Sequence, residues 1–336
     1  MVLIAIQRSR GLMRHVLGGR FALVTFHEVY RCPTCLGLLQ ERPETLWCNH
    51  CSVKYPVSDL VPDFVRGAYY DQFDDSTVLT AEHRRALDLE IAGAIGRITE
   101  YYLPLIARTN TDQSIRILDA GCGNGLSVDL LIGKGHDAWG IDSSSLRRWQ
   151  WRDRAHRDHL AVADGAKLPF PDAHFQVLLC SGVLEHVGVE ETGGGHYRVN
   201  VLPHRDAARR LFLTGLLRVL APGGTLYLDF PNGAFPIDFW HNTRGGSARF
   251  HSVYEGFLPT FADISRLGKQ INPAITVASV SPNRRLRFQQ VRQHWYGRAF
   301  AAPMQLLFAM MDCFPRLARS AVNPFLVIRL TKPKAS

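Results

Sequence analysis

Apolar residues follow two different periods along the chain, and the changes between them predict the secondary structure. Short apolar runs of the kind found in buried strands lie near 115–119, 137–142, 159–163, 175–180 and 224–230. Apolar residues at helical spacing lie between them, near 125–133, 143–156 and 205–220. Strands that alternate with helices are typical of a parallel, doubly wound α/β sheet. We therefore expect such a sheet over 114–232, with helices on both faces.

The flanking segments are less regular. Apolar residues at helical spacing predict a helix over about 80–107, with Pro104 in its last turn. The run Phe325-Leu-Val-Ile-Arg-Leu330 predicts a final buried strand. Residues 304–311, which include three methionines, predict a helix that faces the core, and a lipid-facing groove is the alternative. The resulting division is a basic extension at 1–31, a cysteine module at 32–68, and a main domain at 69–336 with a C-terminal region from 233.

The net charge of +9 is concentrated at the two ends of the chain. Basic ends suit RNA phosphates, anionic lipid head groups or a phosphorylated substrate, and equally a solvated surface. Residues 1–31 alternate apolar and basic positions, which fits an amphipathic helix on a membrane surface or a simple extension. No apolar run approaches the ~20 residues that cross a bilayer, and Met1–Ile6 is too short for a signal peptide. We expect a cytoplasmic protein, with peripheral contact to anionic membrane as an option.

Four cysteines form an ordered set near the N-terminus. Cys32 and Cys35 make one C-x2-C pair, and Cys48 and Cys51 make a second pair after twelve residues. Four thiolates at this spacing favour a closed tetrahedral zinc site, in which the metal supplies folding energy to a module too small for its own core. Iron is the alternative occupant, and His50 could replace a cysteine. The sequence therefore predicts a structural zinc ribbon.

A glycine-rich turn follows the first predicted strand, in Ile117-Leu-Asp-Ala-Gly-Cys-Gly-Asn-Gly125. Such a turn brings bare backbone close to a ligand. The spacing departs from the dinucleotide fingerprint G-x-G-x-x-G, and Asp119 stands where a phosphate ligand would be disfavoured. A carboxylate there suits a ligand with an ammonium group and a sulfonium, which is the charge pattern of S-adenosylmethionine (SAM).

Two further acids stand at the ends of the next two predicted strands. Asp142 comes about 20 residues after the turn, where an acid can accept hydrogen bonds from both ribose hydroxyls. Asp164 follows the third strand and can meet the exocyclic amine of adenine. Open α/β sheets bind ligands at this edge. The three acids in order strengthen the prediction of a SAM site.

With these motifs, residues 114–232 resemble a class I SAM-dependent methyltransferase of the small-molecule type related to ubiquinone and menaquinone biosynthesis enzymes. The resemblance is carried by the turn at 117–125, Asp142, Ala163-Asp164 through Pro169-Phe170, Phe175–Val187, and Arg218–Gly224 leading into Thr225–Phe230. It implies a Rossmann-like seven-stranded sheet with an antiparallel last strand. It places Asp119 and Gly121 near the methionine part of SAM, Asp142 near the ribose, Asp164 near the adenine and Ser181 near the methyl group. Neighbouring positions complete the predicted cofactor site: Cys122, Gly123, Gly125, Ser143 and Gly165. The segment up to Phe64 resembles zinc-ribbon domains fused to, or partnering, methyltransferases.

The candidate catalytic residues are His186 and His241. His186 follows the fourth strand and could accept a proton from an acceptor hydroxyl, with Glu185 orienting it or binding substrate. His241 lies in the loop after the fifth strand, where Asp238, stacked Phe239 and Trp240, and Asn242 would suit a sugar. The alternatives are a packed histidine and a hydrophobic plug. The stretch 188–203 is longer than is usual in the family, and its glycines predict a flexible segment that closes over the substrate.

The sequence thus favours an enzyme that methylates a small-molecule or glycan acceptor, including a lipid-linked one. An RNA base methyltransferase is the first alternative, favoured by the zinc module and the basic ends. Against this alternative, the chain lacks the Asp/Asn-Pro-Pro-aromatic motif that many base methyltransferases have after the fourth strand. Cys180-Ser-Gly-Val183 stands at that position instead. A catalytically silent SAM sensor or partner protein is the second alternative.

Overall fold

The computed structural model describes residues 25–67, 69–70, 88, 90–109, 114–192, 197–241, 249–285 and 295–335. Residues 1–24 of the predicted basic extension lie outside this part, as do Gly193–Gly195 and Asn242. Helix α1 (Phe26–Val29) begins the described chain. Among the described helices, none combines the length and the apolar character that a bilayer crossing needs.

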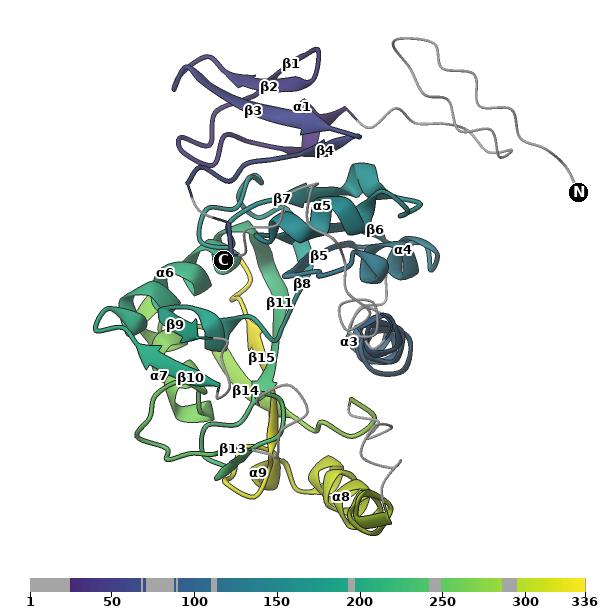
Figure 1. Ribbon diagram of the computed structural model, residues 1–336, viewed down its shortest axis with the longest axis vertical. Coiled ribbons are helices and arrows are strands. Elements are labelled where there is room, and N and C mark those ends of the chain that lie inside the picture. The colour runs from purple at the N-terminus through teal and green to yellow at the C-terminus, as the bar shows by residue number, and fades with distance from the viewer. Residues whose placement is uncertain are drawn as a thin grey trace, which may run out of the picture.

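A mixed seven-stranded sheet forms the centre of the molecule (Figure 1). Its strands are β5 (Arg116–Ala120), β6 (Asp137–Asp142), β7 (Leu160–Val162), β8 (Phe175–Ser181), β11 (Leu220–Pro231), β14 (Thr276–Val280) and β15 (Phe325–Thr331). Their order across the sheet is β14-β15-β11-β8-β5-β6-β7. β15 runs antiparallel to both neighbours, and the ladders among β5, β6, β7, β8 and β11 are parallel. This confirms the Rossmann-like seven-stranded methyltransferase sheet.

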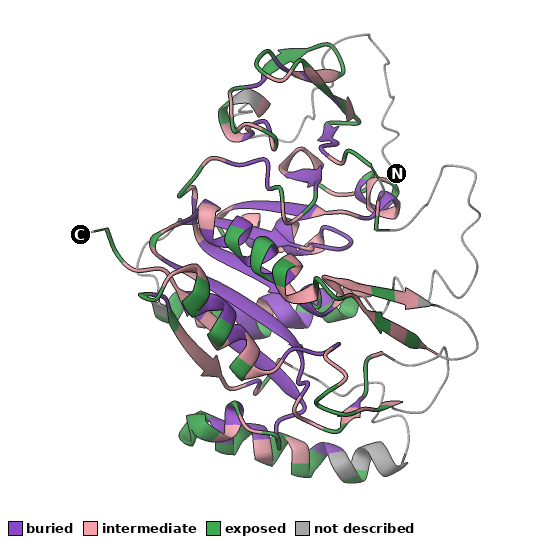
Figure 2. Ribbon diagram, turned by 90° about the vertical axis from the view of Figure 1, so that its left-hand side faces the viewer, coloured by how far each residue is buried: buried purple, intermediate pink, exposed green. Residues whose placement is uncertain are grey.

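Helices cover both faces of this sheet, and successive strand residues supply the two cores. Leu118 faces one core, together with α6 (Arg205–Val219) and α7 (Phe261–Ile271). Ile117 faces the other core, with α4 (Leu126–Ile132) and α5 (Ser145–Trp151). Figure 2 shows the strands as the continuous buried centre between these layers. The predicted helices near 125–133, 143–156 and 205–220 are therefore present, the second of them shorter than expected.

The helical segment before the sheet differs from its prediction. It contains a π-helical stretch, η1 (Gly96–Tyr102), and continues as α3 (Leu103–Thr109). Pro104 thus lies in the second position of α3, and the prediction that it marks the last turn is wrong. The Leu103 N–H bonds the Ile98 carbonyl five residues back. This wide turn accommodates a proline ring that an ordinary helix interior would exclude.

The predicted flexible stretch at 188–203 contains a β-hairpin. β9 (Val189–Thr192) and β10 (Arg198–Val201) pair antiparallel, with Val189 opposite Val201. The Leu202 N–H closes the base of the hairpin by donating to the Gly188 carbonyl at 3.1 Å. Cross-strand pairing orders the two arms of the stretch, and the prediction of flexibility at Gly193–Gly195 lies outside the described residues. A shorter pair, β12 (Ile237–Asp238) and β13 (Arg249–Phe250), holds the loop after β11.

The C-terminal helices form a small cluster of their own. α8 (Trp295–Cys313) buries Phe308 and Met311 against Ala318 of α9 (Pro315–Ala318), while Leu306 and Met310 are exposed. The helix predicted at 304–311 is present. It packs on α9, and none of its described side chains belongs to the two cores of the sheet.

The cysteine module is a four-stranded antiparallel sheet packed against the edge of the main sheet. Its strands are β1 (Gln40–Arg42), β2 (Thr45–Cys48), β3 (Val53–Ser58) and β4 (Val61–Pro62). Asp63 then pairs in parallel with Val162 of β7, and the Phe64 N–H donates to the Val162 carbonyl at 2.8 Å. Tyr30 is fully buried against Trp139 and Phe170. The module therefore shares the core of the main domain.

Candidate active site

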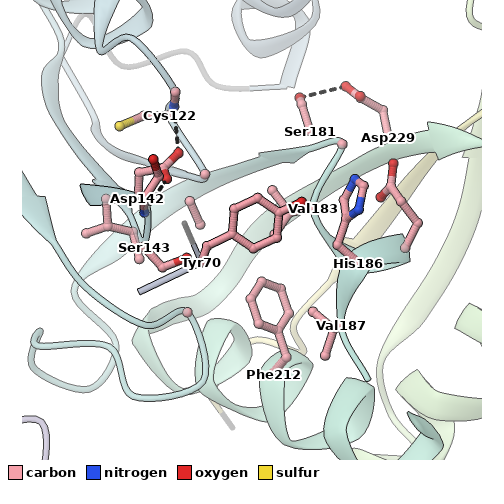
Figure 3. A pocket seen from close by; sticks show the side chains of 18 of the residues that line it. Tyr70, Cys122, Asp142, Ser143, Ser181, Val183, His186, Val187, Phe212 and Asp229 are labelled. Atoms are coloured by element: carbon pink, nitrogen blue, oxygen red, sulfur yellow. Dashed lines mark hydrogen bonds between the residues drawn. The ribbon is translucent and has the colours of Figure 1, made fainter. Parts of the chain in front are cut away.

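A cavity of about 750 Å³ opens at the carboxyl ends of the parallel strands. This volume lies within the ~300–1,000 Å³ range of small-molecule sites. Residues of the predicted cofactor site, such as Asp142, and the candidate catalytic residue His186 both line this cavity (Figure 3). The predicted residues in its wall are Gly121, Cys122, Gly123, Asp142, Ser143, Asp164, Gly165, Ser181, Glu185, His186 and His241. Residues far apart in the sequence are thereby brought to one site.

The glycine turn is required by close packing. Gly121 has φ +86°, and a Cβ there would lie 2.3 Å from Cγ2 of Val183. Gly125 has φ +76°, and its Cβ would lie 2.8 Å from Leu160 and 3.0 Å from Trp151. A side chain at either position would need both a disfavoured backbone conformation and space that is already filled. The missing side chain at Gly121 thus leaves the backbone of the turn at the surface of the cavity. At Gly125 it lets the start of α4 pack closely against the sheet.

Asp142 connects the glycine turn to the end of β6. Its Oδ2 accepts the Gly123 N–H and its Oδ1 accepts the Ser144 N–H, both at 3.0 Å. Burial raises the pKa of Asp142, and Arg147 opposes that shift. The carboxylate still lines the cavity, and each oxygen has a further lone pair for a ligand hydroxyl.

Asp119 lies behind the cavity wall. It is fully buried, and its Oδ2 forms an ion pair with Nη2 of Arg97 at 3.0 Å. Arg97 itself lines the cavity. Asp119 is therefore not among the residues that line the cavity, and its carboxylate fixes a guanidinium that does. Arg97 comes from the helical segment that the apolar pattern predicts over about 80–107, in which the sequence analysis named no site residue.

The end of β7 provides an exposed acid beside tightly packed backbone. Asp164 Oδ1 accepts the Ala166 N–H at 2.9 Å, and the side chain is open to solvent at the cavity edge. A Cβ on Gly165 would lie 2.2 Å from the ring of Phe212 on α6.

Cys122 is buried next to Asp142, and burial raises the pKa of its thiol well above the ordinary value. Cys122 is thus a packing group in the protonated form.

Ser181 belongs to a buried network centred on Asp229. Ser181 donates to Asp229 Oδ2 at 2.8 Å, and Tyr102 donates to the same oxygen. Arg285 binds both carboxylate oxygens, at 2.9 and 3.0 Å. Burial acts to raise the pKa of Asp229, but Arg285, with the hydrogen bond from Tyr102 and the charge of Arg97, lowers it. Sequence reasoning missed this use of Arg285, which it had counted with the basic C-terminal surface.

The two candidate catalytic histidines meet at the other end of the cavity. Their ring centroids are 5.2 Å apart. His186 Nδ1 contacts Oε1 of Glu191 on the hairpin, and Tyr197 donates to the other oxygen of Glu191. His241 Nδ1 lies 3.0 Å from Asp238 Oδ2. Each imidazole is therefore held through Nδ1 by its own carboxylate.

Hydrogen bonds and neighbouring charges shift the pKa values of His186 and Asp238. Burial acts to lower the pKa of His186, but its hydrogen bond to Glu191 and the charge of Glu185 outweigh burial and raise it. The hydrogen bond and charge of His241 lower the pKa of Asp238 to about 2, against the effect of burial. Asp238 is also bound by Arg249 at 3.1 Å. It is thus a support for His241 and not the sugar ligand that the sequence suggested.

Glu185 completes a compact group with the two histidines. One ligand-capable atom from each of Glu185, His186 and His241 lies within 4.8 Å of the others. Glu185 is 1% exposed, and its Oε2 has no hydrogen-bond partner among the described residues. Burial raises its pKa.

Aromatic side chains border the cavity, although not as a stacked pair. Phe239 and Trp240 meet edge to face at 84°, so the predicted stacking is wrong. Trp240 lines the cavity and packs on Phe325. Tyr70, from the segment that leaves the cysteine module, lies between Asp142 and His186 in Figure 3. Its N–H donates to the Ser143 carbonyl at 3.1 Å, and its ring centroid is 6.1 Å from that of His186.

The four cysteines of the module converge. Cys32 Sγ lies 4.0 Å from Cys51 Sγ, and Cys35 Sγ lies 3.6 Å from Cys48 Sγ. All four sulfur atoms lie within 4.8 Å of one another. Zinc–sulfur bonds of about 2.3 Å in a tetrahedron require sulfur atoms roughly 3.8 Å apart. His50 is exposed and lies outside this group. The thiols fit a structural zinc ion.

Comparisons with known proteins agree with this geometry. Residues 118–228 match the model of the methyltransferase domain, so the chain contains such a domain. A protein of Mycolicibacterium smegmatis named as an S-adenosylmethionine-dependent methyltransferase is 29% identical over 116 residues, which are 34% of this chain and 38% of that protein. The ubiquinone/menaquinone biosynthesis C-methyltransferase of Laribacter hongkongensis is 27% identical over 158 residues, 44% of this chain and 55% of that enzyme. The chain thus spans between about a third and about half of these two curated relatives.

One of the similar solved structures is the S-adenosylmethionine dependent methyltransferase from Mesorhizobium loti. It is 15% identical, covers 68% of this chain and 96% of its own, and has a TM-score of 0.41.

Proposed function

We propose that this protein transfers a methyl group from SAM to a small-molecule or glycan acceptor, including a lipid-linked one. The observation that carries the proposal is the single cavity with two chemically different ends. One end has the glycine turn and Asp142, and the other has His186 and His241. The matched methyltransferase domain covers both the turn and His186.

The cofactor end offers a complementary group for each part of SAM. Asp142 would accept hydrogen bonds from the ribose hydroxyls, and Asp164 would accept one from the adenine amine. The Arg97 guanidinium would bind the carboxylate of the methionine part, because Asp119 holds it at the cavity wall. Backbone at Gly121 would approach the same part of the ligand, since no side chain intervenes.

The acceptor end would position a nucleophile and handle its proton. SAM brings its own leaving group, so the protein has to hold the attacking atom ~3–3.5 Å from the methyl carbon, in line with the breaking bond. His186 and His241 face this end, and their carboxylate partners fix their orientation. Such imidazoles suit a hydroxyl acceptor, which must lose a proton during transfer. The likeness to a quinone-biosynthesis methyltransferase supports an acceptor of small size.

We also propose that the cysteine module holds a structural zinc ion. The four convergent thiols support this assignment, and their closed arrangement leaves no position for a substrate. Its contribution would be to fold the module that carries the chain to Tyr70 at the cavity.

The proposal is tested in two steps with the full-length chain. Calorimetry should show binding of SAM and of its demethylated product, S-adenosylhomocysteine. Methyl-labelled SAM is then incubated with separate extracts of polar metabolites, lipids and RNA. Label in the metabolite or lipid fraction supports the proposal. Label confined to RNA would overturn the acceptor class, and binding of NADH in place of SAM would overturn the cofactor.

A further inference from the structure

We propose that Glu185, His186 and His241 bind a divalent metal ion at the acceptor end of the cavity. This ion would be separate from the zinc of the cysteine module, and the acceptor's oxygen atoms would coordinate it. The inference deepens the proposed function and rests on it. It names the acceptor class as a compound with a hydroxyl and a second adjacent oxygen donor, such as a vicinal diol.

The first support is the way the two imidazoles are held. Metal-bound histidines characteristically use one ring nitrogen for the metal and the other for a carboxylate, which fixes the tautomer and the ring orientation. His186 uses Nδ1 to contact Glu191, and His241 uses Nδ1 to contact Asp238 at 3.0 Å. Nε2 is therefore the nitrogen that each ring has left for a metal. The two histidines share this arrangement, and their rings meet edge to face with centroids 5.2 Å apart.

The second support is the buried carboxylate between them. Glu185 is 1% exposed, and its Oε2 lacks a hydrogen-bond partner among the described residues. A buried carboxylate oxygen without a partner is costly, and buried charges are normally paired or bound to a metal. Arg209 comes close but donates to the backbone carbonyl of Glu185, at 2.9 Å. A cation among the three ligand atoms would satisfy the free oxygen.

The local charge also favours a cation. Three carboxylates surround the histidines, those of Glu185, Glu191 and Asp238. Arg249 is shared between Asp238 and Glu255, so it offsets only part of this charge. Neutral imidazoles, the form that binds metal, leave the group net negative. A divalent ion would compensate that charge.

The donor set indicates the kind of ion and what it could do. Two histidines and one carboxylate are the ligands of catalytic zinc and of open iron(II) sites. Three protein ligands leave coordination positions open, and all three residues line the cavity. Magnesium and calcium prefer all-oxygen sites, so we assign a first-row transition ion such as Zn²⁺.

Coordination would also account for the proton of the acceptor. A metal lowers the pKa of a bound hydroxyl, so its O–H bond can break near neutral pH with the proton leaving to bulk water. The oxygen would then form a bond to the methyl carbon as the bond from carbon to sulfur breaks, which yields the methyl ether and S-adenosylhomocysteine. His186 and His241 would act through the ion and not as free bases.

Metal content and Zn²⁺ titration of the full-length chain test this inference. The wild type should hold one more ion per chain than the double variant Glu185→Gln/His241→Ala, with the ion at the cysteines present in both. Glu191→Gln should lower the Zn²⁺ affinity of the additional site ~10–100-fold, because it removes the carboxylate that orients His186 and not a metal ligand. Glu190→Gln on the same hairpin is the matched control, since Glu190 is exposed and bonds Asn200 instead. It should leave both sites unchanged.

Equal metal content in the wild type and the double variant would overturn the inference. SAM affinity separates this failure from failure of the proposed function, because the substituted residues lie at the acceptor end. A double variant that binds SAM like the wild type is folded, and its metal content then decides the inference alone. A wild type that binds the additional ion without binding SAM would retain the metal site and refute the cofactor assignment on which its role depends.

Discussion

Arg97 donates to both carboxylate oxygens of Asp119, at 3.0 and 3.5 Å, beneath the glycine turn. The pair is buried, and burial acts to lower the pKa of Arg97, but the charge of Asp119 together with those of Asp229 and Tyr102 raises it. One charged group of the cofactor site is thus supplied by the segment before the sheet and positioned by the first strand.

Asp119→Asn should therefore impair both stability and SAM binding. Removing one partner of a buried ion pair costs about 3–5 kcal/mol, because it leaves the other charge uncompensated. Urea denaturation should show a loss of this size, and calorimetry should show weaker SAM binding. Asp172→Asn is the control: Asp172 pairs with Arg218 on the surface at 69% exposure, and its removal should cost under ~1 kcal/mol. Equal losses in the two variants would contradict the role of the buried pair.

Asp142→Ala should weaken SAM binding about 100-fold or more. The substitution removes the proposed ribose acceptor and releases the Gly123 N–H, which shapes the turn. Asp137→Ala, at the opposite end of the same strand, serves as the control, because the Asp137 carboxylate lies away from the cavity and accepts from the Trp139 indole at 2.8 Å. Calorimetric titration of both variants checks this. Unchanged affinity in Asp142→Ala would refute the ribose assignment.

Removing the metal from the cysteine module should destabilise more than the module. Tyr30 packs on Trp139 and Phe170, and the module pairs with β7, so both parts share a core. Cys48→Ser, or a strong chelator, should lower the melting temperature of the whole chain by several degrees. Differential scanning calorimetry with metal analysis checks this. Cys313→Ser, at an exposed cysteine outside the cluster, should change neither quantity. A main-domain transition that does not move when Cys48 is replaced would show that the two parts fold separately.

Stability should fall as the pH drops from about 6.5 towards 4. His174 accepts from the Arg116 guanidinium at 3.1 Å, and burial followed by the charge of Arg116 lowers its pKa to about 4. A folded-state pKa below the ordinary 6.5 means that the unfolded chain binds the proton first. The contribution of neutral His174 to the free energy of unfolding is therefore fully present above pH 6.5. The pKa shift implies ~3 kcal/mol, which the partial exposure of the ring reduces to roughly 1–2 kcal/mol.

His174→Gln keeps an acceptor for Arg116 but cannot titrate. Its unfolding free energy should therefore change less than that of the wild type between pH 6.5 and 4.5, as measured by urea titrations at each pH. An identical pH profile in the two proteins would assign the acid sensitivity to other groups.

Local patterns predicted most of the fold but only part of the site. The strands around Ile117 and the final strand from Phe325 were predictable, because continuous apolar runs reflect burial on both faces. β14 was missed because its five residues lie at a half-exposed edge, where the apolar signal is weak. The hairpin was missed because its strands are held by cross-strand bonds around a glycine tract. The predicted site residues at strand ends converge, since parallel strands deliver their carboxyl ends to one edge.

The remaining site residues depend on distant packing. Arg97 lies in a helical segment whose pattern indicated only core, and Arg285 counted as surface charge until its partner Asp229 was located. Tyr70 reaches the cavity because the module before it is docked on β7. The sequence shows an arginine between the apolar positions of this helical segment, but neither its burial nor its partner can be read from that position.

The pairing of Asp63 with Val162 also bears on how copies of this protein could associate. A strand at the rim of a sheet offers unpaired N–H and C=O groups to any other chain. At β7 those groups face the cysteine module, whereas β14 at the opposite rim ends the ladder. Among the described strands, β14 is thus the edge that remains for pairing between copies, and loss of the proposed zinc ion would expose the edge at β7 as well.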